Sequence, residues 1–490
     1  KNKKNIFISL GTKNDQEIMK LRTQYNKILK KKFGVFHCVS NYPLLPINSN
    51  LFYLDKLKKI FKNSYIGYSS HDNNLLIPSL ALGKKLDFIE RHVTFDKNAK
   101  GLDHSSSSNF SEIEQLNFLC KNIEKIYFSN QNNRKIVNQG ELINLQNLGI
   151  GYSSKKFLKK GKRILAKDIE EKYGKSLGSP YTEIINKVLK KDLKKGQLID
   201  SSYFEKKKKL SPISLKKLDK NLISLPIRPK DYKSIDGEFG LKHYEFHLSF
   251  NDVKNLKFEK LNKNFLKKKI FSVHAPDYCD ENHILDIFSN DLKIKKKSEL
   301  IINKCVDFCR YLSKITNFNA KLICSFSKIN KNENKKKFYA KLSKYILKIK
   351  HKKNILILPQ WLPTCAWYFG GSNQISVFSD PRDLAILKSL RLYICMDISH
   401  FLLSCNFNKI RPDNFFKKYL NLYKHYHISD AIGVDGEGVL LGSGEISKTQ
   451  ILPTIFKRKK NISVIETWQG HLNGYNLFKK DISYLLKNIF

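Results

Sequence analysis

The sequence predicts an α/β protein in which parallel strands alternate with helices. Residues 1–128 and 222–490 each place short apolar runs between helical patterns, a rhythm typical of parallel strands joined by helical crossovers. Residues 129–205 differ, because their apolar residues come in short bursts between glycines and lysines, which predicts a small, turn-rich β module. Residues 206–221 are polar and rich in lysine, so a linker is expected there.

The first region contains four predicted strands. They are expected at residues 6–10, 34–39, 65–68 and 86–89, and a helix over 15–31 should follow the first of them. The run Ser111-Glu112-Ile113-Glu114 reads as a capping box, which predicts a helix from there to about residue 127.

The last region has room for a complete barrel. Its strand candidates are residues 222–227, 243–248, 270–274, 320–325, 354–358, 392–396, 425–428 and 462–465. Eight parallel strands with helices in this length predict a (β/α)8 (TIM) barrel, whose chemistry lies on the loops after the strands. Polar residues that directly follow these strands are therefore the candidates for a site.

Positive charge dominates the composition, with 90 Lys and Arg against 44 Asp and Glu and a net charge of +46. Such an excess is typical of nucleic-acid binders. However, only 10 of the 90 are Arg, the residue suited to bidentate recognition of phosphate and guanine. The sequence is also rich in Asn, Ile, Phe and Tyr, which indicates codon drift, so no nucleic-acid partner is expected.

Cysteine use and hydropathy indicate a reduced, cytoplasmic protein. The nine cysteines are odd in number and include no CxxC pair. Cys305 and Cys309 are four residues apart, a spacing expected for core packing on one face of a helix. No run of about 18 apolar residues is present, so no membrane partner is expected.

Unusual polar residues end the predicted strands of the first region. His71 follows the third strand and His92 the fourth, so both should face one cavity. Two imidazoles there can hold a divalent metal that polarises a carbonyl group. The alternative is that each histidine is an ordinary, hydrogen-bonded polar residue.

Three motifs of this region, CVSNYP, GYSSHD and ERHVTFDKNAKGLDH, resemble the sialic acid synthase family in order and spacing. Residues 134–199, ending in KVLKKDLKKGQLI, are similar to the SAF-type, antifreeze-like module of that family. The resemblance covers about residues 5–200. It implies a transferase that condenses phosphoenolpyruvate with an N-acylmannosamine-type sugar to give a nonulosonic (sialic) acid, using Mn²⁺ or Mg²⁺, and it implies a homodimer.

The resemblance also implies roles for individual residues. His71 and His92 match the two metal-ligating histidines of the family. The residues taken to bind substrate are Ser40, Asn41, Tyr42, Ser69 and Asp103.

This sequence departs from the family pattern at several points. The strand at 6–10 matches about the fifth of eight, so residues 1–128 are expected to be the C-terminal half of a (β/α)8 barrel and the chain a fragment. The missing half supplies a phosphoenolpyruvate-binding lysine and an acidic catalytic residue in the family. Ser70 stands where the family usually has Asp, and the turn Lys172-Tyr173-Gly174-Lys175 lacks the family's Arg.

The second barrel carries its own set of residues at strand ends. The runs HAPD, DISH, HISD and ETWQGH resemble the xylose-isomerase-like barrel superfamily of sugar isomerases and epimerases over about residues 240–490. Asp397, His427 and Glu466 match three of four metal ligands, for Mn²⁺, Mg²⁺ or Zn²⁺. Gln360 stands where the fourth, usually a Glu, is expected, and Gln can ligate through its carbonyl oxygen but brings no charge. Glu466 is the expected catalytic base, and His400 is expected to contact substrate.

These features predict a nonulosonic acid synthase-like enzyme of surface carbohydrate biosynthesis fused to a sugar isomerase or epimerase-like barrel. Trp361 and Trp367 are expected to wall a sugar pocket in that barrel. One alternative is a sugar-binding protein in which both sites have decayed. Another is a metal-dependent DNA-processing enzyme of the apurinic endonuclease branch, against which Gln360 argues because that branch needs more charged ligands.

Overall fold

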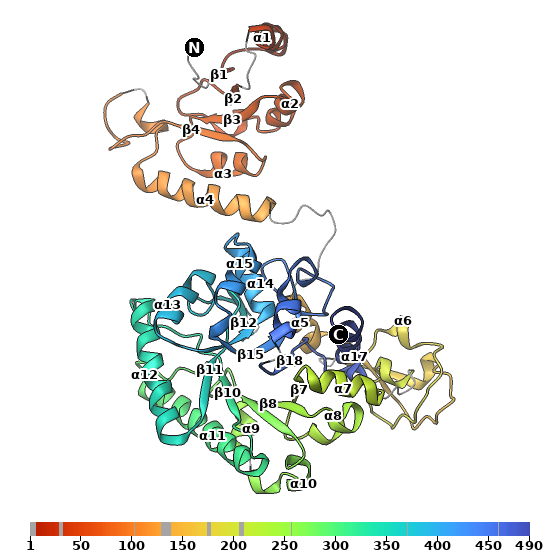
Figure 1. The fold of residues 1–490 in the computed structure, drawn as a ribbon. Helices are drawn as coiled ribbons and strands as arrows, with labels where there is room; N and C mark the ends of the chain where they lie inside the picture. Colours follow the sequence, from red (N-terminus) through yellow and green to blue (C-terminus); the bar gives the residue numbers. More distant parts are fainter. Residues whose placement is uncertain are drawn as a thin grey trace. The chain divides into compact units, whose positions relative to one another are not determined.

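The computed structural model describes residues 6–28, 33–101, 103–128, 139–173, 178–204, 210–255, 257–369, 371–458 and 460–490. The chain forms two compact units, Lys1–Ile136 and Val137–Phe490 (Figure 1). The first unit contains a four-stranded parallel sheet, and the second contains a β-rich module and an eight-stranded parallel sheet. The predicted α/β class is confirmed.

The first unit is a parallel sheet in the order β1-β2-β3-β4. Its strands are β1 (Phe7–Ser9), β2 (Gly34–Cys38), β3 (Tyr65–Ser70) and β4 (Phe88–Arg91), and its helices are α1 (Asp15–Ile28), α2 (Tyr53–Ile60), α3 (Leu76–Leu82) and α4 (Phe110–Phe128). All four predicted strands are present, and each pairs in parallel with the next. Residues 29–31 of the first predicted helix lie outside the described residues.

Strand alternation gives this sheet two different faces. Val35 and Tyr68 point to the face that packs in the hydrophobic core beneath the helices. The opposite face carries an aromatic cluster, in which the ring of Phe7 lies 5.7 Å from Phe36 and 4.9 Å from Phe88. A Cβ atom at Gly34 would lie 2.3 Å from the Phe7 ring, so this close approach requires glycine.

The start of α4 differs from the prediction, because Asn109 caps the helix. Asn109 Oδ1 accepts the backbone N–H of Glu112 at 2.9 Å, and Glu112 Oε2 accepts the backbone N–H of Asn109 at 3.0 Å. This is a capping box two residues earlier than the one predicted at Ser111. The Ser111 hydroxyl instead donates to Asn109 Oδ1 at 2.8 Å.

The second unit opens with α5 (Gln139–Leu148) and a β-rich module. In that module β5 (Ile150–Ser154) and β6 (Ile169–Tyr173) pair in antiparallel fashion, and isolated bridges join Ser153 to Leu198 and Leu158 to Leu193. The module has a small apolar core of its own. Its likeness to the SAF type stays a prediction, and Gly174 and Lys175 of the family turn lie outside the described residues.

The eight predicted strands of the last region form one parallel sheet. They are β7 (Ile223–Ile227), β8 (His243–His247), β9 (Ile270–His274), β10 (Lys321–Cys324), β11 (Leu356–Pro359), β14 (Ile394–Asp397), β15 (Tyr423–Ile428) and β18 (Ser463–Ile465). Their order is β11-β10-β9-β8-β7-β18-β15-β14. A parallel bridge between Gln360 and Cys395 brings the two end strands together, so the predicted barrel is confirmed.

Helices surround this barrel, and two hairpins interrupt its loops (Figure 1). The helices are α8 (Tyr232–Phe239), α9 (Phe250–Asn255), α10 (Lys263–Leu266), α11 (Leu292–Thr316), α12 (Lys335–Lys353), α13 (Leu384–Ser389), α14 (Ile398–Phe407), α15 (Pro412–Lys418), α16 (Ile451–Arg458) and α17 (Asn476–Asn488). One hairpin pairs β12 (Cys365–Tyr368) with β13 (Gly371–Gln374), and the other pairs β16 (Asp430–Ile432) with β17 (Gly436–Val439). Cys305 and Cys309 are buried in α11, which confirms their predicted core packing.

The segment predicted as a linker includes a helix of the barrel, α7 (Pro212–Lys220). Ser211 caps it by accepting the backbone N–H of Ser214 at 3.2 Å, and Pro212 takes the first helical position. Leu218 is fully buried in the barrel core. The lysines suggested a linker, but Leu215 and Leu218 form an apolar stripe that docks the helix. Residues 206–209 lie outside the described residues.

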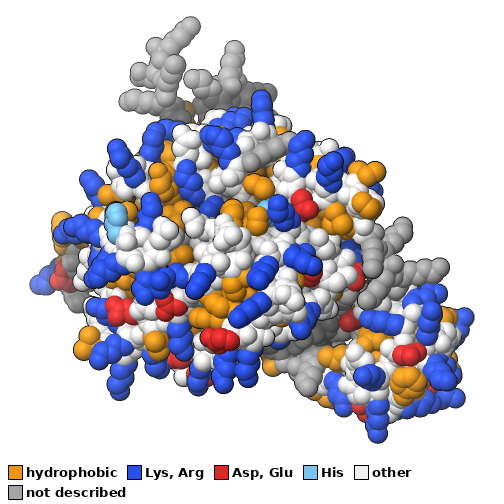
Figure 2. All heavy atoms as spheres, turned by 60° about the horizontal axis from the view of Figure 1, so that its bottom comes forward, with side chains coloured by type: hydrophobic (Ala, Val, Ile, Leu, Met, Phe, Trp, Pro, Cys, Tyr) orange, Lys and Arg blue, Asp and Glu red, His pale blue; other side chains and the backbone are white. Residues whose placement is uncertain are grey.

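Lysine side chains cover much of the surface. Figure 2 shows Lys and Arg scattered over the visible face, with Asp and Glu among them. The lysine runs 295–297 and 335–337 lie in α11 and α12, as solvated helix faces would. Within the part of the chain that the structure describes, no helix combines the length and apolarity needed to cross a membrane.

Candidate functional site

The first unit brings the two predicted metal ligands together. His71 directly follows β3 and His92 directly follows β4, and their ring centroids lie 5.3 Å apart. The ring of Tyr42 lies 4.2 Å from that of His71 and 6.0 Å from that of His92. Asp103 Oδ2 lies 3.7 Å from His92 Nδ1. Four of the predicted residues therefore form one cluster at the carboxyl ends of the strands.

Hydrogen bonding fixes how His71 presents its ring. Its Nδ1 lies 3.0 Å from the backbone oxygen of Val39, and a carbonyl oxygen can only accept, so Nδ1 carries the proton. The lone pair of a neutral ring is then on Nε2, which is the arrangement that a metal-ligating histidine needs.

The other predicted substrate residues lie around this cluster. Ser69 is buried, and its hydroxyl donates to Glu90 Oε1 at 2.7 Å. Ser40 and Asn41 are exposed on the loop after β2. By strand alternation Ser69 and Glu90 share the sheet face that carries the aromatic cluster, so they line the same side as the histidines.

Ser70, where the family pattern has Asp, belongs to a buried network on the opposite face. Its hydroxyl donates to Asp72 Oδ2 at 2.6 Å and accepts from Arg91 Nη1 at 2.8 Å. Arg91 also donates through Nε to Ser108 Oγ at 2.8 Å. Burial raises the pKa of Asp72, and the hydrogen bond from Ser70 and the charge of Arg91 oppose that rise. These residues support β3 and β4 from behind the histidines.

The first cluster suits a cation that keeps open coordination positions. It offers two imidazoles and, beside His92, one exposed carboxylate. Among the described residues, the groups of three potential ligands whose atoms lie within 4.8 Å of one another are all in the second barrel. The first cluster therefore brings fewer than three ligand atoms this close together. A metal held by His71 and His92 would thus leave positions for a sugar oxygen and water, where it can polarise a carbonyl.

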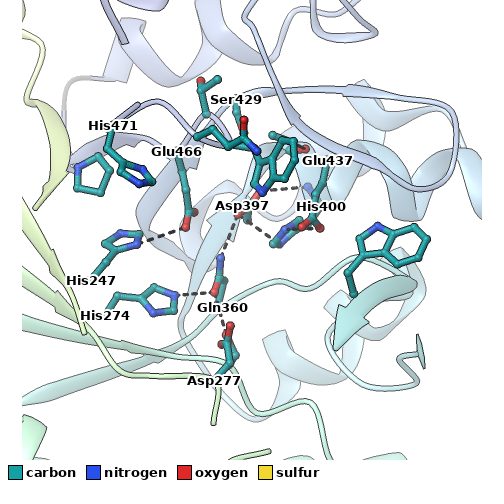
Figure 3. A pocket seen from close by; sticks show the side chains of 18 of the residues that line it. His247, His274, Asp277, Gln360, Asp397, His400, Ser429, Glu437, Glu466 and His471 are labelled. Atoms are coloured by element: carbon teal, nitrogen blue, oxygen red, sulfur yellow. Dashed lines mark hydrogen bonds and ion pairs between the residues drawn. The ribbon is translucent and has the colours of Figure 1, made fainter. Parts of the chain in front are cut away.

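The second barrel has a pocket of about 510 Å³ at the carboxyl ends of its strands (Figure 3). The charged and polar residues that line it include His247, His274, Asp277, Ser325, Gln360, Asp397, His400, Ser429, Glu437 and Glu466. They come from the ends of seven different strands and the loops that follow them, as is usual for a barrel enzyme. The predicted residues Gln360, Asp397, His400 and Glu466 therefore share one pocket.

The predicted ligands of this barrel are in direct contact. His427 Nδ1 lies 2.5 Å from Glu466 Oε2 and 3.7 Å from Asp397 Oδ2. Gln360 Nε2 lies 3.0 Å from Asp397 Oδ2 and 3.1 Å from His427 Nδ1. Oxygen and nitrogen atoms at this spacing can surround one small divalent cation. His427 and Glu466 also form a compact group with His274, an imidazole that the sequence reasoning did not assign as a ligand.

A fully buried carboxylate, Glu245, supports the site from below. It accepts hydrogen bonds from His425 Nε2 at 2.8 Å and His427 Nε2 at 2.9 Å, and its Oε1 also lies 2.9 Å from His247 Nε2. The Ser272 hydroxyl donates to it at 2.5 Å. Burial alone would raise the pKa of Glu245, but His427 and His425 hold it well below its usual value.

Glu245 fixes the side of His427 that faces the ligands. A carboxylate accepts, so Nε2 of His427 carries a proton, and Nδ1, 2.5 Å from Glu466 Oε2, would offer its lone pair to a cation only after giving up the proton that it donates to Glu466. Nδ1 is the atom that faces Asp397 and Glu466. This is the carboxylate–histidine support found behind metal-ligating histidines. Together with the atom spacing, it means that the residues present fit a divalent cation.

His400 lies between two carboxylates at the side of the pocket. Its Nδ1 is 3.2 Å from Asp397 Oδ2, and its Nε2 is 3.3 Å from Glu437 Oε2 on β17. Burial would lower the pKa of His400, but Asp397 and Glu437 outweigh burial and raise it to about 10. His400 therefore presents a positive charge beside the pocket near neutral pH.

Sequence reasoning missed Glu245 and Glu437. Glu245 lies inside β8, two positions before the strand end, and the alternation of His243, Glu245 and His247 on one face was the signal that could have found it. Glu437 is on a hairpin that was not predicted. Trp361 is fully buried in the core, so its expected place in the pocket wall was wrong, whereas Trp367 does line the pocket.

Comparisons with known proteins agree with the predicted resemblance of the first unit to sialic acid synthases. Residues 1–132 match the family model described as the NeuB family. The chain is 32% identical over 190 residues to human N-acetylneuraminate-9-phosphate synthase, which covers 38% of this chain and 51% of that protein. It is 30% identical over 201 residues to N,N'-diacetyllegionaminic acid synthase of Campylobacter jejuni, 40% of this chain and 59% of that protein. The chain thus spans about half the length of these curated relatives.

Among solved structures, the probable 3-DHS dehydratase AsbF of Bacillus anthracis aligns with a TM-score of 0.39 and 15% identity, over 54% of this chain and 99% of that one. The match of residues 1–132 to the NeuB family model confirms the predicted resemblance to sialic acid synthases for this part of the chain.

Proposed function

We propose that the first unit belongs to a nonulosonic acid synthase, a transferase that condenses phosphoenolpyruvate with an N-acylmannosamine-type sugar. The observation that carries this is the pair His71 and His92, 5.3 Å apart beside Tyr42, within a domain of the NeuB family. Relatives named as N-acetylneuraminate-9-phosphate and N,N'-diacetyllegionaminic acid synthases support the substrate class. The protein acts in the cytoplasm as a homodimer, in carbohydrate biosynthesis.

The residues of this unit have distinct roles in that reaction. His71 and His92 hold Mn²⁺ or Mg²⁺, which supplies Lewis acidity at the sugar carbonyl. Ser40, Asn41, Tyr42 and Ser69 position the sugar, and Asp103 orients His92.

Release of phosphate from phosphoenolpyruvate by the full-length protein, with N-acetylmannosamine and Mn²⁺ present, tests this function. His92→Ala should lower the rate by about 100-fold or more, because it removes a metal ligand. The matched control is His104→Ala, since His104 lies in the same loop region but bonds to the hydroxyl of Thr94 at 2.7 Å. An absence of phosphate release with every N-acylmannosamine-type sugar would contradict the proposal.

The second barrel, we further propose, isomerises or epimerises a sugar that the first unit uses or makes. Asp397, His427, Glu466 and Gln360 hold a divalent cation, which supplies polarisation of a sugar carbonyl, and Glu466 takes the proton from the neighbouring carbon. His400 contacts the substrate from the side of the pocket. The supporting observation is the convergence of these groups in one pocket of about 510 Å³.

Metal content tests the second site directly. Asp397→Asn keeps a side-chain oxygen to cap α14, where Asp397 Oδ1 accepts the backbone N–H of His400 at 3.0 Å, but it removes the ligand charge. Bound Mn²⁺ should fall clearly below wild type, whereas Asp231→Asn, which also lines the pocket, should leave it unchanged. Equal metal content in wild type and Asp397→Asn would remove this site from consideration.

A further inference from the structure

The second barrel has another pocket, of about 800 Å³, at the end of the barrel opposite to the proposed cation site. Its lining includes the first residues of three strands, since His243 begins β8, Ile270 begins β9 and Lys321 begins β10. His247, which lines the pocket of the cation site, ends the strand that His243 begins, about 13 Å away at roughly 3.3 Å per residue. The two pockets are therefore separate, with the buried Glu245 between them on β8.

Positive charge gathers around this second pocket without acidic partners. Five lysines line it, namely Lys216, Lys220, Lys242, Lys321 and Lys460. Asp219 is the one carboxylate among the described residues of its wall, and its Oδ1 accepts the backbone N–H of Lys242 at 3.0 Å. None of the five lysines forms a salt bridge within the part of the chain that the structure describes. Their ammonium groups repel one another, and an anion in the pocket would relieve that repulsion.

Lys321 differs from the lysines scattered over the surface, because it begins a strand inside the barrel. Ile323 on the same strand packs with Leu358 and Cys395 inside the barrel, and Lys321, two positions earlier, points the same way. Its Nζ donates to the backbone oxygen of Lys424 at 2.7 Å, which uses one of its three N–H donors. Burial lowers the pKa of Lys321. Two donors of this half-buried ammonium group remain for a ligand.

His243 forms the floor of the pocket. It is 3% exposed, and its Nδ1 is buried without a hydrogen-bond partner among the described residues. Burial lowers its pKa to about 4, so the ring is neutral near pH 7 and carries one N–H. Ser224, which pairs in register with His243, also has a buried hydroxyl without a partner in the described part of the chain. Such groups are rare in native proteins, so this pair distinguishes the pocket from a patch of surface lysines.

We propose that this pocket binds a small molecule that carries a phosphate or pyrophosphate group. Lysine binds phosphate as a point charge, and several lysines can approach a tetrahedral group from different sides. Five ammonium groups against one carboxylate also match an anion of charge −2 or more, which a phosphate group approaches at pH 7 and a single carboxylate does not. Leu215 and Phe318 in the wall contact the apolar part of the molecule.

This site goes beyond the proposed function, because it uses neither the cation sites nor the reactions assigned to them. Chemistry in TIM-barrel enzymes lies at the carboxyl ends of the strands, whereas this pocket lies at the amino ends. The bound molecule therefore stabilises or regulates the barrel and does not react there.

Calorimetric titration of the full chain with inorganic pyrophosphate tests this proposal. Metal-free buffer keeps the cation sites out of the measurement, and a salt concentration of about 0.15 M screens separated surface charges. Two double variants, each with two fewer positive charges, are compared. Lys216→Gln with Lys242→Gln changes two lysines of the pocket. Lys217→Gln with Lys268→Gln is the matched control, because both of these lysines are exposed but do not line the pocket.

The pocket pair should bind pyrophosphate about tenfold more weakly than wild type, whereas the control pair should stay within about twofold. His243→Phe removes the N–H at the floor and keeps a ring of similar size, so it should weaken binding about fivefold. Its thermal transition shows whether it folds, and the two lysine pairs decide the question if it does not.

Three results would overturn the proposal. Equal losses of affinity in the two lysine pairs would mean that the overall charge binds pyrophosphate. Absence of saturable binding by wild type, or unchanged affinity in a folded His243→Phe, would remove the site. If the pocket pair weakens binding of a short DNA duplex but not of pyrophosphate, these lysines contact nucleic acid instead.

Discussion

Glu245 shows how a single buried residue can organise a site. Its carboxylate accepts from His425, His427 and Ser272 and contacts His247, and none of its surface is exposed. Burial lowers the pKa of His425 to about 4, so this ring is neutral near pH 7 and donates through Nε2. The negative charge of Glu245 is therefore distributed over donors from three different strands.

Replacing Glu245 by Gln should destabilise the barrel. The new NH₂ group would face N–H donors, and removal of one partner of a buried charged network costs about 3–5 kcal/mol. We expect the calorimetric transition of the barrel to shift to a clearly lower temperature, with no comparable shift for Glu259→Gln at an exposed position. A shift equal to that of the control would mean that the four contacts contribute nothing to stability.

Asp481 on α17 gives a pH-dependent prediction. Burial raises its pKa from 3.8 to about 6, although Thr467 and the backbone N–H of Leu441 donate hydrogen bonds to it. The folded state then binds the proton more tightly than the unfolded state, so stability is lost as the pH rises from about 4 to 6 and stays lower above that. The loss is about 3 kcal/mol, from a shift of roughly two pKa units.

Asp481→Asn should remove this dependence, because the amide does not ionise. The variant should gain stability relative to wild type between pH 4 and 6, by up to about 3 kcal/mol, as measured by urea unfolding of the barrel at several pH values. Asp307→Asn changes a side chain that is 49% exposed, so its plot of unfolding free energy against pH should run parallel to that of wild type. Parallel curves for Asp481→Asn as well would show that the raised pKa is absent.

At the scale of elements, one carboxylate holds the loop after the β16–β17 hairpin. Asp430 accepts backbone N–H groups from Ala431 at 2.8 Å, Gly442 at 3.0 Å, Gly444 at 2.8 Å and Ile446 at 2.8 Å. A Cβ atom at Gly444 would lie 2.1 Å from the backbone oxygen of Ala431, so the turn is too tight for any other residue. The hairpin that carries Glu437 depends on this loop.

Asp430→Ala should open that loop while the barrel strands stay folded. Four charge-assisted hydrogen bonds are lost, so amide hydrogen exchange over residues 440–446 should accelerate by about 100-fold or more. Exchange in β7 and β8 should stay as in wild type. Asp435→Ala, in the same hairpin, is the control, and similar exchange in both variants would contradict the role of Asp430.

The strands were predictable from the sequence, but the two hairpins and the buried Glu245 below the second site were not. Every expected strand is present, because buried parallel strands are continuous apolar runs that propensity and pattern both favour. Metal-site candidates were found because polar residues directly follow those runs, as at His71 and Asp397. Glu245 was missed because a charged residue inside an apolar strand is decided by cross-barrel partners, such as His425 and His427, which are far away in sequence.

Local sequence signals also gave wrong predictions where tertiary packing determines the structure. The cap of α4 is Asn109 rather than Ser111, since both can cap and only the packing of the helix start selects one. The lysines of residues 212–220 suggested a linker, although Leu218 docks this segment on the barrel. The sequence pattern thus predicted a capped helix at α4 and a lysine-rich segment at residues 212–220. Tertiary contacts determined which residue caps the helix and whether the segment packs on the barrel.

At the scale of the molecule, the charge of +46 makes a prediction about nucleic acid. The visible lysines are scattered rather than gathered in one stripe (Figure 2), and the proposed ligands of the second barrel include a neutral residue, Gln360. We expect weak, sequence-independent binding to duplex DNA that falls steeply between 50 and 200 mM salt. We expect no incision of a duplex that contains an abasic site, with either Zn²⁺ or Mn²⁺ present. Incision that Asp397→Asn abolishes would instead favour the apurinic endonuclease alternative.

The network around Glu245 has a consequence for how this protein can change over evolutionary time. A surface position can accept a lysine with little effect, because water solvates the new charge. Glu245, His425 and His427 offer no such freedom, since any single replacement leaves the others with an unmatched donor or acceptor in the barrel interior. These positions are therefore expected to vary together or not at all, so in a set of homologous barrels their identities should be strongly correlated while the lysines around them vary independently.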